Sequence, residues 1–147
     1  MISYERMVET HVPQIARLET QCFSDPWSEK SIASELENPL SLWLVALSGD
    51  TVVGYVGSQS VLGEADMMNI AVDEACRRQG IGKNLVLNLV EQLKEQGIHS
   101  LSLEVRQSNA PAIALYEEMG FQQVGLRPNY YRNPKENAMI FRKEWTV

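Results

Sequence analysis

The period of the hydrophobic pattern changes in the middle of the chain, and this change limits the folds open to it. In residues 81–93 the apolar positions recur at spacings of three and four, which is typical of a helix, and Gly97 stops it. The preceding segment 65–73, "ADMMNIAVD", and the following segment 99–106, "HSLSLEVR", have the pattern of strands. A strand, a helix and a strand in this order predict a right-handed parallel crossover.

The remaining segments place further elements around this crossover. Strands are expected at residues 3–8, 41–47, 51–61, 121–131 and 137–145, and helices at residues 11–22, 28–38 and 109–120. Turns at Gly49-Asp50 and Gly63 join the strands before the crossover as an antiparallel meander. The expected fold class is therefore α/β (α+β), with a mixed, mostly antiparallel sheet of about seven strands, a central parallel β-α-β crossover and about four helices.

The composition is that of a single globular domain, which we expect to span residues 1–147. Hydrophobic residues make up 44% of the chain and charged residues 22%, and there is no repeat or linker. No apolar run approaches the ~20 residues of a membrane span, and the N-terminus does not resemble a signal peptide, so we expect a cytoplasmic protein without a membrane partner. The two cysteines and two histidines do not cluster, which argues against a metal site.

The charge of the chain is unevenly distributed. Residues 1–76 carry a net charge of −9 and residues 77–147 carry +3, for a total of −6. A protein with this balance is not expected to bind nucleic acid. The asymmetry has two interpretations: chance variation of the surface, or one half that faces an anionic ligand while the other faces a cationic one.

The segment "CRRQGIGKNL" at residues 76–85 joins the last strand of the meander to the central helix. A helix N-terminus exposes unpaired N–H groups and carries partial positive charge, so a glycine-rich loop at this point can hold a phosphate. Gly80 and Gly82 could instead permit only a tight turn and close packing. A Walker loop is absent, and Leu85 stands where a dinucleotide-binding fingerprint has glycine or alanine.

The run Arg77-x-x-Gly80-x-Gly82 resembles the Q/R-x-x-G-x-G/A motif with which GCN5-related N-acetyltransferases (GNAT) bind the pyrophosphate of acetyl-CoA. The segments "FSDPWSEKS" and "LEVRQSNAPAIALYEEMGF" are similar to the RimI-type branch of that family, which acetylates the N-terminal alanine of a small-subunit ribosomal protein. The resemblance covers almost the whole chain. It implies the GNAT fold, acetyl-CoA as cosubstrate, no metal, and the N-terminus of a ribosomal protein as partner.

The resemblance also implies two catalytic residues. Glu104 lies on the polar side of its predicted strand and would be the general base for an amine whose pKa is near 8. Tyr116 would be the general acid that protonates the thiolate of CoA. Each has a simpler interpretation, because a strand glutamate can be solvated and a helix tyrosine can pack its ring on the sheet.

Further residues correspond to the family's cofactor and acceptor sites. The backbone of one strand, at Ile70, Ala71 and Val72, would pair with pantetheine. The glycine loop would bind the pyrophosphate through Arg78, Gln79, Gly80, Ile81, Gly82 and Lys83. Asn109 would contact the cofactor or cap its helix, and the loop aromatics Trp27, Tyr130 and Tyr131 would line the acceptor groove or only pack against the protein.

The sequence therefore predicts a peptide α-N-acetyltransferase that transfers the acetyl group directly in a ternary complex. One alternative is an acetyltransferase for another amine, either a protein lysine or a small molecule, whose higher pKa would require a stronger base. A second alternative is an acetyl-CoA-binding module without catalysis, which would need neither Glu104 nor Tyr116. The oligomeric state stays open.

Overall fold

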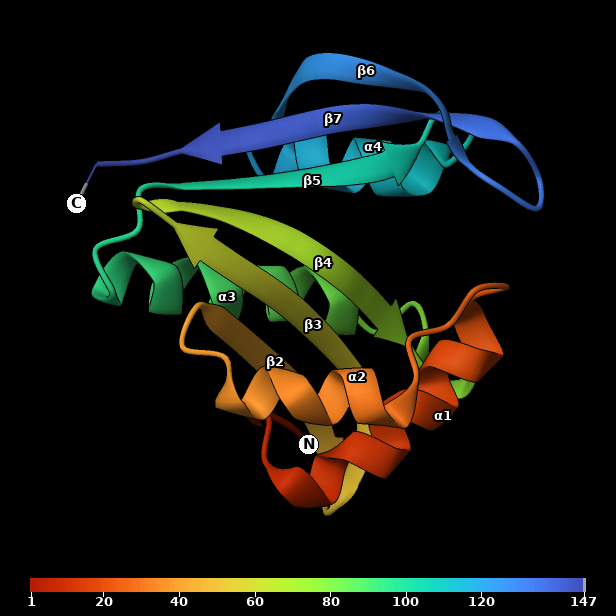
Figure 1. The fold of residues 1–147 in the computed structure, drawn as a ribbon, viewed down its shortest axis with the longest axis vertical. Coiled ribbons are helices and arrows are strands. Elements are labelled where there is room, and N and C mark those ends of the chain that lie inside the picture. The colour runs from red at the N-terminus through yellow and green to blue at the C-terminus, as the bar shows by residue number, and fades with distance from the viewer. Residues whose placement is uncertain (147) are drawn as a thin grey trace.

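The computed structural model describes residues 1–146, and its strands form one seven-stranded sheet (Figure 1). The strands are β1 (Ile2–Arg6), β2 (Ser41–Ser48), β3 (Thr51–Val61), β4 (Glu64–Val72), β5 (Ser100–Arg106), β6 (Gln122–Tyr131) and β7 (Glu136–Glu144). Their order in the sheet is β1-β2-β3-β4-β5-β7-β6, and every neighbouring pair is antiparallel except β4 with β5. The predicted fold class and its parallel crossover are confirmed.

The helices of residues 1–146 are α1 (Val12–Cys22), α2 (Glu29–Ser34), α3 (Ile81–Glu95) and α4 (Ala110–Glu118), with short 3₁₀ turns η1 (Glu9–His11), η2 (Glu35–Glu37) and η3 (Glu74–Cys76). Two of these four helices, α2 and α4, begin at the capping residues that the sequence predicts, Ser28 and Asn109. Ser28 Oγ accepts the Ser31 N–H at 3.0 Å, and Asn109 Oδ1 accepts the Ala112 N–H at 3.2 Å. Within residues 1–146, no helix has both the length and the apolar character needed to cross a membrane.

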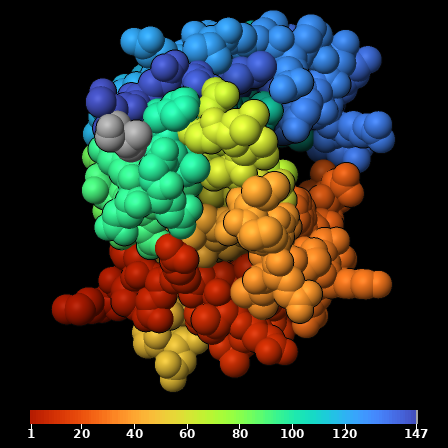
Figure 2. All heavy atoms as spheres, turned by 60° about the vertical axis from the view of Figure 1, so that its left-hand side comes forward, coloured from red at the N-terminus to blue at the C-terminus, as the bar shows by residue number. Residues whose placement is uncertain are grey.

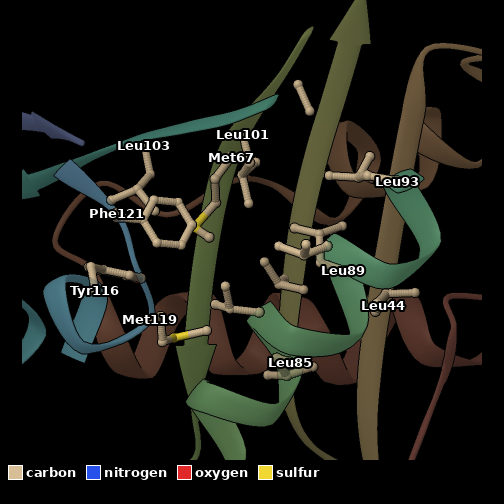
Figure 3. Close-up of a cluster of buried hydrophobic side chains, with 14 of the residues drawn as sticks. Leu44, Met67, Leu85, Leu89, Leu93, Leu101, Leu103, Tyr116, Met119 and Phe121 are labelled. Carbon is tan, nitrogen blue, oxygen red and sulfur yellow. The ribbon is translucent and has the colours of Figure 1, made fainter. Parts of the chain in front are cut away.

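Helices cover both faces of the sheet because the central strands are apolar on both sides. On β2, Leu42 and Leu44 belong to the core under α3, whereas Trp43 and Val45 belong to the core under α1. In Figure 1, α3 and α4 lie behind the sheet, and α1 and α2 lie in front of it. Figure 3 shows the larger core, in which the leucines of α3 meet the side chains of β2, β4 and β5.

The parallel pairing of β4 with β5 is short. It runs from Glu64 opposite Ser100 to Asp66 opposite Ser102, and then the two strands separate, as Figure 1 shows. A bulge follows at once, because Ser58 of β3 pairs with Met67 while Gly57 pairs with Asn69, which leaves Met68 without a partner. In Figure 2, the C-terminal strands (blue) lie above the N-terminal third of the chain (red to orange). The sheet therefore divides into two parts joined at one end of β4 and β5.

The bulge lies beside a tight packing point on β3, and this yields a test of the fold. Trp43 lies directly opposite Gly57, and a Cβ at Gly57 would overlap the Trp43 indole. The indole stacks on Tyr55 and donates to Glu35 Oε1 at 3.2 Å, so it has little freedom to move. We expect Gly57→Ala to lower the free energy of unfolding by about 1–3 kcal/mol, measured by urea denaturation.

A double-mutant cycle with Trp43→Leu checks that the cost arises from this contact. The double variant should lose less stability than the sum of the two single variants, because the smaller leucine leaves space for the new methyl group. Additive losses would contradict this explanation of Gly57.

Candidate active site

The separation of β4 from β5 opens a cavity of about 340 Å³. Residues 67–70 of β4 form one wall, and residues 103–106 of β5 form the opposite wall. Side chains of α4, the end of β6 and Phe23 complete the lining. The cavity thus collects residues from both halves of the sheet and from the loops at its ends.

Glu104 lies in the β5 wall of this cavity, on the side of the strand opposite the buried Leu103 and Val105, as the alternation predicts. Its side chain is 26% exposed, and Oε1 lies 3.4 Å from Nε of Arg127, which is 55% exposed. Exposed ion pairs of this kind contribute only about 0–1 kcal/mol. The carboxylate is therefore oriented by Arg127 but easily released from it.

Tyr116 lines the same cavity from α4 and is almost entirely buried. Its ring packs edge-on against Phe121 with the ring centroids 5.6 Å apart, and Figure 3 shows both at the border of the larger core. Burial raises the pKa of the Tyr116 hydroxyl to about 12, because the phenolate would lose its hydration. The hydroxyl is therefore a protonated hydrogen-bond donor throughout the neutral range.

The backbone of β4 beyond the bulge presents an edge to the cavity. Asp73 N–H donates to Val53 O at 2.8 Å, so the backbone groups of Asp73 and, by alternation, of Ala71 point toward β3. Those of Ile70 and Val72 point the other way, toward the gap left by β5. Of the three residues predicted to pair with pantetheine, Ile70 and Val72 therefore point toward the gap, and Ala71 is engaged in the sheet. The Val72 carbonyl accepts a hydrogen bond from Arg77 Nε at 3.2 Å.

The glycine loop ends at the N-terminus of α3, beside this strand edge. Gly80 caps the helix with φ +76°, a conformation that favours glycine. Gly82 has no such requirement, and a Cβ there would meet nothing nearer than Val72 Cγ2 at 3.8 Å. Neither the backbone conformation nor steric contact within the protein therefore requires glycine at position 82.

The first helical hydrogen bond of α3 runs from Asn84 N–H to Gly80 O at 3.0 Å. The amides of Ile81, Gly82 and Lys83 precede it and lie in the first turn, where N–H groups have no partner within the helix. Arg78, at φ +67°, and Gln79 are exposed beside them. These backbone groups and the open space over Gly82 fit an anionic ligand.

Two predicted cofactor residues also have structural partners. Lys83 Nζ lies 3.0 Å from Glu118 Oε1 and joins α3 to α4. Asn109 caps α4 and also lines the cavity, so its two predicted roles are compatible.

On the acceptor side, the structure places the predicted aromatic residues differently. Tyr130 and Tyr131 line the cavity, and their rings meet edge-on at 5.1 Å. Trp27 is not part of the lining, because its ring packs on Trp43 with the centroids 5.4 Å apart. Phe23, from the same loop, lies in the lining instead.

Arg106 is a cavity residue that the sequence analysis did not single out. It donates to the Arg132 and Pro134 carbonyls at 3.0 and 2.9 Å, and its guanidinium lies 4.4 Å from the Tyr131 ring centre. It thereby holds the β6–β7 loop against the site. The sequence feature that could have identified Arg106 is its place in the strand "LEVR", two residues after Glu104. Glu104 and Arg106 are the charged residues of the lining, so the cavity itself is not predominantly acidic.

No cluster of possible metal ligands lies in this region. No group of three or more His, Cys, Asp or Glu side chains suited to a metal ion occurs in the part of the chain that the structure describes. The polar groups of the cavity are one carboxylate, one guanidinium, three phenol hydroxyls, two asparagines and the outward backbone groups of Ile70. These are suited to binding an extended ligand and transferring protons.

Comparison with known proteins agrees with this arrangement. Residues 12–121 match the Acetyltransferase (GNAT) family. The ribosomal protein bS18-alanine N-acetyltransferase of Salmonella typhimurium is 42% identical over 134 residues, which cover 89% of both proteins. The crystal structure of the ribosomal-protein-S18-alanine N-acetyltransferase from Escherichia coli has a TM-score of 0.92 at 36% identity and covers 100% of this chain and 96% of that one.

The structure of Arabidopsis thaliana NAA60 in complex with acetyl-CoA has a TM-score of 0.89 over 98% of each chain. At 17% identity it supports the fold alone. The family match extends over most of the chain, and the bacterial relatives cover nearly all of it. This chain therefore belongs to the GNAT family of N-acetyltransferases.

Proposed function

We propose that this protein uses acetyl-CoA to acetylate the N-terminal alanine of the small-subunit ribosomal protein bS18, by direct transfer in a ternary complex. The observation that carries the proposal is the cavity between β4 and β5, where Glu104 and Tyr116 face an open strand edge. The acceptor is the one named for the relatives. Ribosomal proteins are made in the cytoplasm, so the reaction belongs there, and residues 1–147 act as a single N-acetyltransferase domain.

Acetyl-CoA supplies an acetyl thioester and a pyrophosphate, and the chain offers a site for each part. The outward backbone groups of Ile70 and Val72 pair with the amides of pantetheine as a neighbouring strand would. The amides from Arg78 to Lys83 receive the pyrophosphate at the positive end of α3. Asn109 also lines the cavity and contacts the same ligand there.

Glu104 acts as the base. An acceptor α-ammonium has a pKa near 8, so a carboxylate is sufficient to remove its proton, directly or through a water molecule. In the free protein the Arg127 guanidinium occupies the cation position beside Glu104. The incoming ammonium takes its place at little cost, because the ion pair is exposed.

The remaining charges of the reaction meet hydrogen-bond donors. As the amine attacks, negative charge develops on the thioester oxygen, and a β4 amide beyond the bulge stabilises it. As the C–S bond breaks, the Tyr116 hydroxyl gives its proton to the sulfur. The acceptor ammonium gives up two protons. The first, removed by Glu104 before the attack, is released to water, and the second, lost from the amine nitrogen after the attack, passes through Glu104 and water to Tyr116. Both residues therefore end in their starting states.

The acceptor enters from the end of the cavity opposite the glycine loop. Phe23 and the Tyr130–Tyr131 pair line the cavity and would contact the first residues of the acceptor peptide there. Trp27 contributes by fixing its loop on Trp43 rather than by touching the acceptor.

The phosphate site can be tested at Gly82, where a side chain is sterically acceptable in the free protein. Gly82→Glu should leave folding intact, because acidic residues are favourable in the first turn of a helix. The same carboxylate should repel the pyrophosphate and weaken acetyl-CoA binding at least tenfold in calorimetry. Leu87→Glu, an exposed position farther along α3, is the control for the added charge. Unchanged affinity in folded Gly82→Glu would rule out this phosphate site.

The catalytic pair can be tested with two variants that preserve shape. Glu104→Gln and Tyr116→Phe should each reduce kcat by about 10²–10⁴, the range of general acid–base catalysis. Acetyl-CoA affinity should stay within about twofold of wild type, because neither side chain belongs to the proposed phosphate or strand-edge contacts. Near-normal turnover in both variants would remove the two residues from the mechanism.

The acceptor can be identified with two peptides that each contain one internal lysine. One begins with a free alanine, the acceptor residue given in the names of the relatives, and the other has its N-terminus blocked. We expect mass spectrometry to find a single acetyl group on the α-amine of the first peptide and none on the second. Acetylated lysine in the blocked peptide would favour a lysine acetyltransferase. Binding of acetyl-CoA without any turnover would favour a non-catalytic module.

A further inference from the structure

Glu19 of α1 is a fully buried carboxylate that the proposed mechanism does not use. Its side chain is 0% exposed and lies on the α1 face that packs against the sheet, together with Ile15 and Leu18. Burial raises its pKa, and hydrogen bonds from the Trp27 N–H and Asn69 oppose that rise. An isolated buried carboxylate is costly, so its polar partners define what it does in this position.

Three neutral donors from three different elements converge on this carboxylate. The Trp27 N–H, in the loop after α1, donates to Oε1 at 2.8 Å. Asn69 Nδ2, in β4, donates to Oε2 at 2.6 Å, and the Tyr55 hydroxyl of β3 donates to the same oxygen. Among the described residues, no lysine or arginine forms an ion pair with Glu19.

Two of these donors belong to segments that contribute residues to the cavity lining: Asn69 to β4, and Trp27 to the loop that contains Phe23. Asn69 is itself a lining residue and follows directly after the bulge at Met68. Met67 faces the core under α3, whereas Asn69 and Ala71 face α1, because the bulge reverses the alternation of the strand. The bond from Asn69 to Glu19 therefore holds β4 in the direction that it takes after it leaves β5.

The other donor fixes the acceptor entrance. Trp27 lies in the loop between α1 and α2, which also contributes Phe23 to the lining. The Trp27 ring packs on Trp43, and its N–H is anchored by Glu19. This loop and the bulged part of β4 thus have one common anchor, and the space between them is where an acceptor must meet the thioester.

We propose that Glu19 is a positioning residue, which sets the distance between the acceptor loop and the bulged part of β4. This inference rests on the proposed function of the cavity. Glu19 does not exchange a proton with the acceptor, since its side chain is fully buried and is not part of the cavity lining. It acts through Trp27 and Asn69, and its loss should misplace the acceptor while the remote phosphate site at α3 is unaffected.

The chain contains a matched control. Glu35 is also a buried carboxylate, with 8% exposure, and accepts hydrogen bonds from Trp43, Ser41 and Gln59. It lines a separate hollow near Arg6 and has no contact with the cavity between β4 and β5. Glu19→Gln and Glu35→Gln therefore make the same chemical change at two buried sites, one beside the cavity and one away from it.

Glu19→Gln cannot satisfy all three donors, because one carboxylate oxygen becomes an NH₂ group. We expect kcat/KM for the alanine peptide to fall about 10²-fold, the scale of a displacement near 1 Å. Acetyl-CoA affinity should change less than twofold. Glu35→Gln should retain kcat/KM within about twofold. Equal losses of kcat/KM in the two variants would overturn the proposal.

Hydrogen exchange separates this inference from the proposed function. In Glu19→Gln, amide exchange should increase in residues 23–28 and also in residues 67–72. In Glu35→Gln, amide exchange should stay unchanged in both segments. This readout decides about Glu19 even if wild-type protein fails to acetylate the peptide, which would instead refute the proposed function. If Glu19→Gln does not fold, Asn69→Ala provides the test, because it keeps Glu19 and removes its bond to β4. Unchanged exchange in residues 67–72 of Asn69→Ala would contradict the proposal.

Discussion

The hydrogen bonds between β4 and β5 stop after three residue pairs, because the bulge at Met68 turns β4 away from its neighbour. A strand in the middle of a sheet normally has partners on both sides, and unpaired backbone groups away from water are costly. Here the outward groups of Ile70 face a cavity instead of a strand, and the outward carbonyl of Val72 accepts a hydrogen bond from Arg77 Nε. The site depends on this interruption, because it supplies both the space for a ligand and the polar edge that can bind one.

The same interruption brings together side chains that a continuous sheet would keep apart. Glu104 lies on β5 and Tyr116 on α4, yet both face the gap opened by β4. Their surroundings suit different roles. Glu104 is partly exposed and paired with Arg127, so an incoming cation can reach it, whereas burial keeps the Tyr116 hydroxyl protonated. These surroundings fit the proposed roles of Glu104 as the base and Tyr116 as the acid.

The loops on the acceptor side are held by contacts with residues inside and outside the cavity lining. Arg106 fixes the β6–β7 loop by hydrogen bonds to two of its carbonyls, and Glu19 and Trp43 fix the loop after α1. Loops with few such anchors would sample many conformations, and transfer between two bound molecules requires their reacting atoms to be held close together. We therefore interpret the polar contacts around the site as positioning the acceptor-side loops rather than as stabilising the fold.

The sequence by itself determined the elements, their caps and the parallel crossover, because helical and strand periods and capping side chains act over a few residues. It also identified Glu104, Tyr116 and the glycine loop through the family's motifs. Only the tertiary structure decided that Phe23 rather than Trp27 lines the cavity, that Arg127 pairs with Glu104, and that Ala71 points into the sheet. The donors to Glu19 lie 8, 36 and 50 residues away in the chain. Such contacts depend on strand register and on where a bulge forms, and these are set by packing across the whole sheet rather than by any local pattern.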